Sequence, residues 1–345
     1  MFNNHKAKIV FFILLITLFI ILIIASILHG PANIPLIHIA PIFKNYLLKN
    51  NETSFPLWQA DIILNVRLPR LIIASFAGAS LALCGVVMQS IFRNPLASPS
   101  ILGVSSGASV GAVLAIYGGF SLMSAWSIPF FAFIGAALSL FIVYKISLTR
   151  GETNIATLLL SGIAMSALNV SAMSLLLALS LNNWDVARMI IYWTMGNLNG
   201  RTWNDVLIIL PIVICAFGLL LFYSKPLDVL LLGEQHALSV GIDVARTRRN
   251  LLIISSTMVA ASVSVVGGIG FIGLVVPHIL RLLLGPSHRY LIPASLFGGA
   301  IALLAADLFV HTLFADQAIP LGVITAAIGA PFFLFLLVKQ RTSLH

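Results

Sequence analysis

The chain has 345 residues, of which 60% are hydrophobic and 8% are charged, with a mean hydropathy of +1.08 and a formal net charge of +9. A soluble domain carries roughly 25% charged residues, so this composition excludes a soluble globular enzyme. It also excludes a disordered chain, which needs low hydrophobicity and high net charge. One bilayer crossing takes about 20 apolar residues, so the chain has room for about ten crossings and for no sizeable soluble domain.

The apolar runs predict an all-α, polytopic membrane protein. The first run, Ile9–Leu28, is too long for a typical signal-peptide core and no small-residue cleavage site follows it, so we expect a retained first span. The later uncharged stretches are Leu71–Phe92, Asn94–Tyr144 (two crossings with a turn at Gly118–Gly119), Thr153–Trp184, Val206–Ser224, Asn250–Leu280 (two crossings), Tyr290–Ala306 and Gln317–Val338. Together they predict ten transmembrane helices.

The basic residues predict the orientation. With the N-terminus inside, the inner segments hold thirteen of them: Lys6, Lys8, Arg93, Lys145, Arg150, Lys225, Arg246, Arg248, Arg249, Arg281, Arg289, Lys339 and Arg341. The outer segments hold six: Lys44, Lys49, Arg67, Arg70, Arg188 and Arg201. Lys and Arg are enriched in cytoplasmic loops, so both termini are expected in the cytoplasm. The positive net charge then reflects topology, and nucleic-acid binding is not expected.

Several chemical motifs are absent or out of context. Cys84 and Cys215 lie in apolar runs and predict neither a disulfide nor a metal site. The chain has no G-x-x-x-x-G-K-[ST] sequence, so we do not expect it to bind ATP phosphates itself. Asp307 is the one ionisable group well within a span, and this scarcity of carboxylates counts against an ion-coupled carrier. A remote alternative is an intramembrane serine protease that uses Ser105, in a G-x-S-x-G match, with His278 as the base.

Small residues mark helix contacts and one helix break. Gly103, Gly107 and Gly111 are spaced by four, which favours close helix packing. The segment 267–273 holds four glycines in seven residues. Broken helices at membrane depth are tolerated where protein or a water-filled cavity covers them, as beside transport paths. A simple extracellular turn is the other interpretation of this segment, and the pattern does not separate the two.

Two loops carry further signals. In the cytoplasmic loop 225–246, two short apolar-periodic segments are split at Gly233–Glu234 and end at Gly241. Such segments either lie on the membrane or dock into a partner's groove. Outside, Arg67 and Arg70 flank the start of the second span; they are either snorkelling anchors or a charged platform for an acidic ligand or partner.

Several ordered motifs together carry a resemblance to a known family. They are Arg67-Leu-Pro-Arg70; Gly78 through Gly85 and Gln89 to Arg93-Asn-Pro-Leu-Ala-Ser-Pro99 and Gly103-Val-Ser-Ser-Gly107; Leu232-Gly233-Glu234 with Gly241; Gly268-Ile-Gly270-Phe-Ile-Gly273 through Pro277-His278 to Arg281; and Asp307, Pro320, Gly322, Gly329 and Pro331. In these stretches the chain resembles the FecCD family, the type II permease subunits of ATP-binding-cassette (ABC) importers for iron–siderophores, haem and vitamin B12.

The resemblance implies a single permease domain over residues 1–345, with spans 2–5 and 7–10 as an inverted repeat, in a bacterial cytoplasmic membrane. It implies a second permease copy or paralogue as partner. It also implies two cytosolic ATPase subunits that contact Leu232, Gly233, Glu234 and Gly241. No cofactor and no catalytic reaction are expected of this chain, because ATP hydrolysis belongs to the partner subunit.

The resemblance further implies that a substrate-binding protein docks on Arg67 and Arg70. His311 stands where the family usually has a third docking Arg, and Ala318 stands where it usually has Glu. The expected path and its helix breaks involve Gly103, Gly107, Gly268, Gly270, Gly273 and Pro277. The expected cargo is an iron(III)–siderophore or similar metal chelate, with vitamin B12 or haem as the alternative.

Overall fold

The computed structural model describes residues 5–30, 32–48, 55–149, 152–314, 317 and 319–342. Its helices are α1 (His5–Leu28), α2 (Leu36–Leu48), α3 (Leu57–Asp61), α4 (Leu68–Ile91), α5 (Val104–Tyr117), α6 (Ser127–Ser147), α7 (Ile155–Leu179), α8 (Trp184–Thr194), α9 (Trp203–Phe222), α10 (Ser224–Leu232), α11 (Glu234–Ser239), α12 (Val244–Val266), α13 (Ile272–Leu284), α14 (His288–Leu313) and α15 (Leu321–Thr342). A π-helical segment, Ile62–Arg67, joins α3 to α4. Short 3₁₀ turns cover Pro99–Leu102 and Phe120–Leu122.

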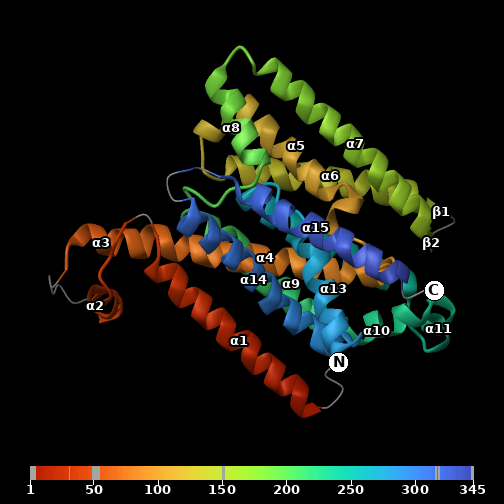
Figure 1. The fold of residues 1–345 in the computed structure, drawn as a ribbon. Helices are drawn as coiled ribbons and strands as arrows, with labels where there is room; N and C mark the ends of the chain where they lie inside the picture. Colours follow the sequence, from red (N-terminus) through yellow and green to blue (C-terminus); the bar gives the residue numbers. More distant parts are fainter. Residues whose placement is uncertain are drawn as a thin grey trace.

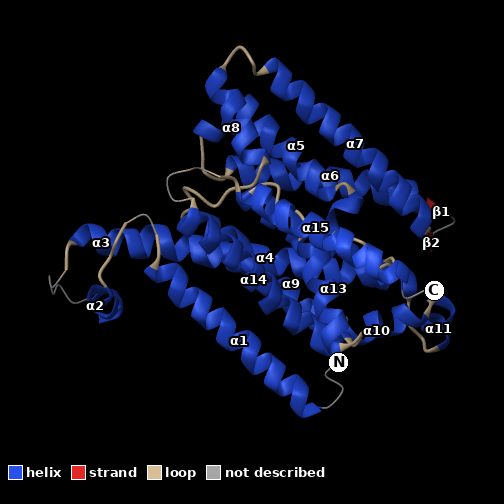
Figure 2. Ribbon diagram, in the orientation of Figure 1, coloured by secondary structure: helices blue, strands red, loops and turns tan. Residues whose placement is uncertain are grey.

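Helices dominate the described chain, and the strands β1 (Leu148–Thr149) and β2 (Glu152–Thr153) form only a small antiparallel hairpin (Figure 2). In its register Leu148 lies opposite Thr153. The hairpin links α6 to α7 at the edge of the bundle. The all-helical fold class expected from composition is therefore confirmed.

Seven helical stretches of the described chain are long and apolar enough to cross a bilayer. They contain α1, α4, α6, α7, α9, α12 and α14, and three shorter apolar helices cover Val104–Tyr117, Ile272–Leu284 and Leu321–Phe335. These ten helices coincide with the ten predicted crossings. A helix rises about 1.5 Å per residue, so Val104–Tyr117 and Ile272–Leu284 span less than a full hydrocarbon core of about 30 Å, whereas α15 as a whole, Leu321–Thr342, is long enough to cross it. The polytopic membrane class is confirmed, and the count of ten crossings stays a prediction.

Helices also form in two connections between predicted spans where none was expected. The amphipathic α8 follows α7 after a turn at Ser180, where the sequence suggested only a loop. The helix α2 lies in the connection between the first two spans. Both are too short for a full crossing and both carry charged side chains, so hydropathy alone does not separate them from loops.

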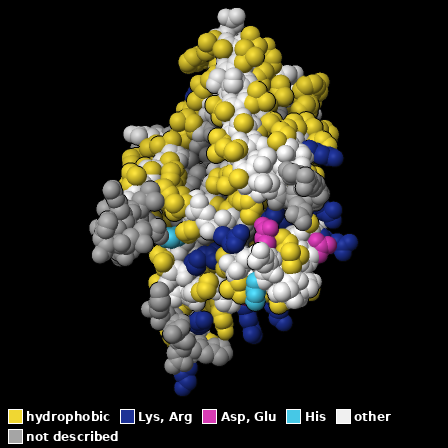
Figure 3. Space-filling model, turned by 90° about the vertical axis from the view of Figure 1, so that its right-hand side faces the viewer, with side chains coloured by type: hydrophobic (Ala, Val, Ile, Leu, Met, Phe, Trp, Pro, Cys, Tyr) yellow, Lys and Arg dark blue, Asp and Glu magenta, His cyan; other side chains and the backbone are white. Residues whose placement is uncertain are grey.

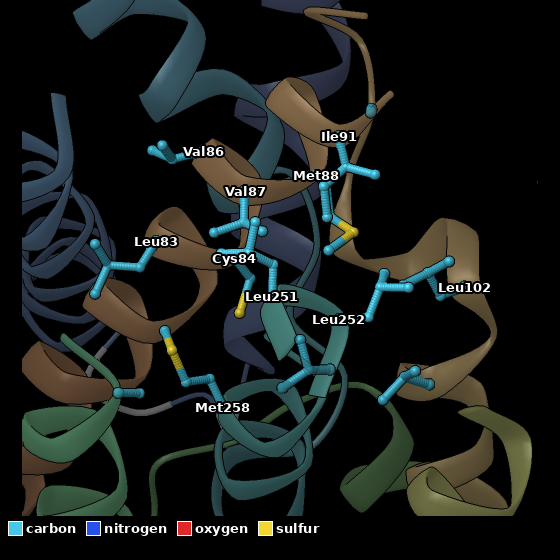
Figure 4. Packing of buried hydrophobic residues seen from close by; sticks show 14 of the residues in the cluster. Leu83, Cys84, Val86, Val87, Met88, Ile91, Leu102, Leu251, Leu252 and Met258 are labelled. Carbon is cyan, nitrogen blue, oxygen red and sulfur yellow. The ribbon is translucent and has the colours of Figure 1, made fainter. Parts of the chain in front are cut away.

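The helix α4 lies at the centre of the bundle. Nearly all of its residues from Leu71 to Ile91 are buried. Figure 4 shows part of this core, where Leu83, Cys84 and Met88 of α4 pack against Leu251 and Met258 of α12. The helices α1 and α7, by contrast, bury few of their apolar side chains, as expected for surfaces that face lipid or another subunit.

Glycines let the central helices approach backbone to backbone. A Cβ atom placed on Gly78 of α4 would lie 2.1 Å from the carbonyl oxygen of Gly299 on α14, and one on Gly299 would lie 2.2 Å from that of Gly78. A Cβ on Gly85 would lie 1.7 Å from the carbonyl oxygen of Gly273 on α13. Glycine is required at such crossings because any side chain would separate the helices.

The bundle has two distinct ends (Figure 1). We call the end that carries α10, α11 and the β1–β2 hairpin the α10 end, and the end that carries α2 and α3 the α3 end. The first turn of α1 and the last turn of α15 both lie at the α10 end. A view onto this end shows Lys and Arg side chains gathered below a largely hydrophobic surface, with acidic side chains beside them (Figure 3).

Candidate functional site

At the α3 end, a buried ion pair joins α4 to α14. The Arg70 guanidinium donates from Nη2 to Oδ1 of Asp307 at 2.6 Å and from Nε to Oδ2 at 3.0 Å. Its Nη1 donates to Oδ1 of Asn199 at 2.6 Å. The side chains of Arg70 and Asp307 are 16% and 2% exposed. The one carboxylate that the sequence placed within a span is thus paired, which offsets the cost of burying it.

The Arg67 side chain is hydrogen-bonded to backbone carbonyl oxygens. We expected it to face outward, and it does not. Its residue is 8% exposed. Its guanidinium donates to the carbonyl oxygens of Ile27, Leu28 and Ala32, at and just beyond the end of α1. The last carbonyls of a helix lack intrahelical donors and carry partial negative charge, so a cation is favoured there. The π-helical segment that contains Arg67 is a kind of irregularity that recurs at functional sites.

A cavity of about 330 Å³ lies beside these two arginines. Its lining includes Arg67, Arg70 and His311, the three residues that the family resemblance suggested for docking, together with His29 and Asp307. Their docking role stays a prediction. Four potentially cationic groups therefore face one carboxylate. Ala318, the second departure from the family pattern, lies outside the described residues.

At the α10 end, Gly233 separates two short helices. Its φ of 123° and ψ of 158° lie in a region that is accessible essentially to glycine alone. Leu232, just before it, is 70% exposed. The split of the loop at Gly233–Glu234 is therefore confirmed as a structural feature.

The helix α11 ends in a Schellman motif at Gly241. The N–H of Gly241, whose φ is 82°, donates to the carbonyl of Leu238, and the N–H of Ile242 donates to that of Ala237. Both bonds satisfy carbonyls at the end of the helix. The prediction that Gly241 ends a helix is confirmed.

Glu234 forms an ion pair with Arg248 of α12. The Glu234 side chain is 42% exposed, whereas that of Arg248 is 5% exposed. The pair fixes the first turn of α11 against the first turns of α12. This ion pair was not predicted, because no sequence pattern connects Glu234 with Arg248.

A second buried polar contact at this end joins α10, α14 and α4. The His288 ring lies with Nδ1 2.6 Å from Oδ1 of Asp228 on α10 and with Nε2 2.6 Å from Oγ of Ser90 on α4. Burial raises the pKa of the Asp228 carboxyl, but the hydrogen bonds from the ring and backbone of His288 outweigh burial and leave that pKa below its ordinary value. Asp228 is therefore ionised at neutral pH.

The glycines expected near the path occupy different settings. Gly103 precedes α5 with a φ of 72°, so it begins the helix and does not lie on its face as the spacing suggested. It packs against Gly162 and Met165 of α7, while Gly107 packs against Gly135 and Ser139 of α6.

The segment 267–273 is an irregular connection between α12 and the short α13. Gly267 and Phe271 have φ values of 73° and 66°. Cβ atoms on Gly267 and Gly268 would lie 2.2 Å and 2.6 Å from backbone carbonyl oxygens at the end of α8, so this part of the connection packs into the protein. Gly270 has open space around it, Gly273 packs on α4, and Pro277 lies within α13. The geometry is that of a short helix covered by protein, and a path along it stays a prediction.

Catalytic and metal chemistry gain no support. Both ring nitrogens of the buried His278 lack a hydrogen-bond partner, so His278 is not held as a base for Ser105. Cys84 and Cys215 are free thiols. Within the described part of the chain, no group of three or more His, Cys, Asp and Glu side chains is placed to hold a metal ion.

The fold and the two polar ends define a polytopic helical membrane protein. The sequence matches the FecCD transport family over residues 18–339. It is 47% identical over 278 residues to the cobalamin import system permease protein BtuC of Halobacterium salinarum, covering 80% of this chain and 73% of that one. It is 38% identical over 328 residues to the hemin transport system permease protein HmuU of Yersinia pestis, covering 94% and 95%.

Solved structures agree with this assignment. The fold superposes with a TM-score of 0.81 and 32% identity on a metal-chelate type ABC transporter in an inward-facing conformation, covering 94% of this chain and 99% of that one. The chain belongs to the FecCD transport family and is a membrane permease. The resemblance drawn from its motifs is thereby confirmed.

Proposed function

We propose that this chain is the permease subunit of an ABC importer that moves a metal chelate into the cytoplasm. The single observation that carries the proposal is the pair of short helices α10 and α11, presented at the end of the bundle where α1 begins and α15 ends. Surface helices on a membrane protein are suited to dock into a partner's groove. The family and the metal-chelate type structural relative support the same class.

The α10 end is the cytoplasmic end in this proposal. It carries the first turn of α1, the last turn of α15 and the basic surface of Figure 3, in accord with the excess of Lys and Arg in cytoplasmic loops. Ten crossings, arranged as an inverted repeat of spans 2–5 and 7–10, place both termini on this side. Such repeats support alternating access around a central site. The membrane is then a bacterial cytoplasmic membrane.

Two cytosolic ATPase subunits would grip the loop 225–246 through Leu232, Gly233, Glu234 and Gly241. The exposed Leu232 offers apolar contact area, and the Glu234–Arg248 pair holds the loop against α12. ATP hydrolysis would occur on those subunits, and this chain would hold no cofactor. A second permease copy or paralogue would complete the path.

A substrate-binding protein would dock at the α3 end. The cavity formed by Arg67, Arg70, His311 and neighbouring residues is rich in potentially cationic groups. Complementary carboxylates on the binding protein would speed encounter and fix its register. Both arginines already hold partners within the protein, Arg67 at the end of α1 and Arg70 at Asp307 and Asn199, so carboxylates of the binding protein would add to these contacts.

We propose an iron(III)–siderophore or a similar metal chelate as the cargo. The form Arg93-Asn-Pro-Leu-Ala-Ser-Pro99 and the metal-chelate type relative favour it. Vitamin B12 or haem is the alternative, since relatives include cobalamin and hemin permeases. The segment 267–273 with Pro277, together with Gly103 and Gly107, would border the path.

Reconstitution in liposomes with the cognate ATPase and binding protein tests the proposal. Ferric siderophores, cobalamin and hemin are offered in turn, and ATP-dependent accumulation is measured. We expect accumulation of a ferric siderophore and none without ATP. Accumulation of cobalamin or hemin alone would overturn the cargo, and accumulation that needs no ATP would overturn the importer class.

A charge reversal tests the ATPase contact. Glu234→Arg places two positive charges together at Arg248 and should detach the first turn of α11. We expect ATP-dependent uptake to fall at least tenfold while the permease still folds. Glu152→Arg, on the β1–β2 hairpin at the same end, is the matched charge reversal. Normal uptake by Glu234→Arg would refute the assignment of this loop.

A further inference from the structure

The contact between α10 and the bundle includes a polar junction that we call the His288 junction, formed by Asp228, His288 and Ser90. Asp228 accepts hydrogen bonds from both the ring Nδ1 and the backbone N–H of His288, at 2.6 Å and 2.8 Å. A carboxylate at the N-terminus of α14 is favourable because of the helix dipole and the free N–H groups there. The other ring nitrogen reaches Ser90 near the end of α4.

The junction stays hydrogen-bonded in two protonation states. The Ser90 hydroxyl has one hydrogen and also lies 2.8 Å from the Val86 carbonyl oxygen. If it donates to Val86, Nε2 of His288 must donate to Ser90, and both ring nitrogens then carry hydrogen because Nδ1 faces a carboxylate. If it donates to Nε2, the ring is neutral and Nδ1 still donates to Asp228. Either way α10 remains linked to α4.

The three side chains of the His288 junction differ in burial. The side chain of His288 is fully buried and Ser90 is buried, whereas the Asp228 side chain is 37% exposed on the surface helix. The buried side chains of α10, Leu227 and Leu230, are apolar. Apolar contacts tolerate sliding, but a hydrogen-bonded ring held on both sides fixes direction and distance.

The helices that the junction reaches form one unit along their length. The helices α4 and α14 are joined at the far end by Arg70 and Asp307 and midway by the Gly78–Gly299 crossing. Packed helices joined in this way shift as rigid elements. A displacement of α10 that reaches Ser90 and His288 is therefore carried to the cavity that contains Arg70.

We propose that His288 is a positioning residue that transmits movement of α10 to the α4–α14 pair. This inference rests on the proposed function, because it takes α10 as part of the loop that the ATPase contacts. The junction makes transport per ATP depend on an intact Asp228–His288–Ser90 connection. Loss of this connection should leave ATP hydrolysis in place and reduce the coupling of ATP hydrolysis to transport.

The test measures uptake and ATP hydrolysis in the same liposomes. Ser90→Ala cuts the connection to α4 and leaves the Asp228 contact, and Asp228→Ala cuts the connection to α10. We expect uptake per ATP to fall at least fivefold in each, with ATPase activity within twofold of the wild type. Uptake per ATP in the double variant should be no lower than in the more impaired of the two single variants, because both changes break the same connection.

Ser75→Ala is the matched control. Ser75 is buried on the same helix and also donates to the carbonyl four residues earlier, but its hydroxyl bonds within α4. We expect wild-type uptake per ATP for this variant. Wild-type coupling in both junction variants, an equal loss in Ser75→Ala, or additive losses in the double variant would overturn the inference. If the wild-type chain itself shows no ATP-dependent uptake, the proposed function fails instead.

Discussion

The helices α4 and α14 are joined at both ends, but by different chemistry. At the α3 end, Arg70 and Asp307 form an ion pair with two hydrogen bonds within the bundle, and among the described residues the pair bonds one further side chain, Asn199. At the α10 end, the link between Ser90 and His288 continues to Asp228 on a surface helix. The first end is closed on itself, while the second is connected to an element that a partner can move. In the proposed importer, this asymmetry would let the ATPase act on the bundle from the α10 end.

The largest loss of stability is expected when the Arg70–Asp307 ion pair at the α3 end is broken. Asp307→Ala leaves the Arg70 guanidinium buried without its carboxylate, which costs about 3–5 kcal/mol. The measurement is unfolding of the detergent-solubilised permease. The double variant Arg70→Met with Asp307→Leu removes both charges and should recover most of that stability. A double variant as unstable as Asp307→Ala would show that the pair is not the source of the loss.

The Gly78–Gly299 crossing of α4 and α14, midway between the two ends, should also be sensitive to substitution. Gly78→Ala would place a methyl group 2.1 Å from the Gly299 carbonyl oxygen, so the helices must separate. Overpacking of this kind costs about 2–3 kcal/mol, which melting in detergent would register. Gly218 of α9 has no neighbour within 4 Å of such a methyl group, so Gly218→Ala should stabilise by about 0.5 kcal/mol. Equal effects at the two positions would contradict the close crossing.

A smaller effect is expected in the loop that leads to the open end. Gly233→Ala meets only the Arg93 guanidinium, at 3.7 Å, so its cost comes from backbone strain alone. That cost is about 1–2 kcal/mol and should appear as increased protease cleavage between α10 and α11. Melting of the whole bundle should change little. A large fall in the melting temperature would indicate a packing role for Gly233.

The smallest effect concerns pH at Asp228. Because folding lowers the pKa of its carboxyl, the stabilisation is complete above the unfolded-state pKa of about 3.9. It is lost as the pH falls through the lower folded-state value. Because the same carboxylate faces the titratable His288 ring, the comparison is made at pH 5 and below. The difference in melting temperature between the wild type and Asp228→Asn should be largest at pH 5 and should close below about pH 4. A difference that persists unchanged at the lowest pH would contradict this order.

The sequence predicted the membrane-crossing segments and the α10–α11 loop because both depend on local patterns. Charge-free runs mark spans, and Gly233 and Gly241 mark the ends of short helices. It did not predict α8, whose mixed composition is that of a loop, or the place of Gly103, whose spacing matches a helix face although its φ is positive.

The polar contacts between helices were beyond local patterns. Arg70 and Asp307 are 237 residues apart, and His288 and Ser90 are 198 apart. One signal was available, since a lone carboxylate within a span requires a partner. Nothing in the sequence distinguishes His288 from any histidine at a helix start, and Arg67 reads as a surface charge although the end of α1 buries it.

Cross-linking to the ATPase tests the difference between the two ends most directly. Cys215 is exposed, so single cysteines are introduced into a Cys215→Ser background. Leu238→Cys reports on α11 and Leu57→Cys on α3; the two leucines are 62% and 76% exposed. We predict that the purified ATPase subunit cross-links to the protein with Leu238→Cys and not to that with Leu57→Cys. Cross-linking from Leu57→Cys, or from neither position in an assembled complex, would contradict the assignment of the α10 end as the ATPase contact.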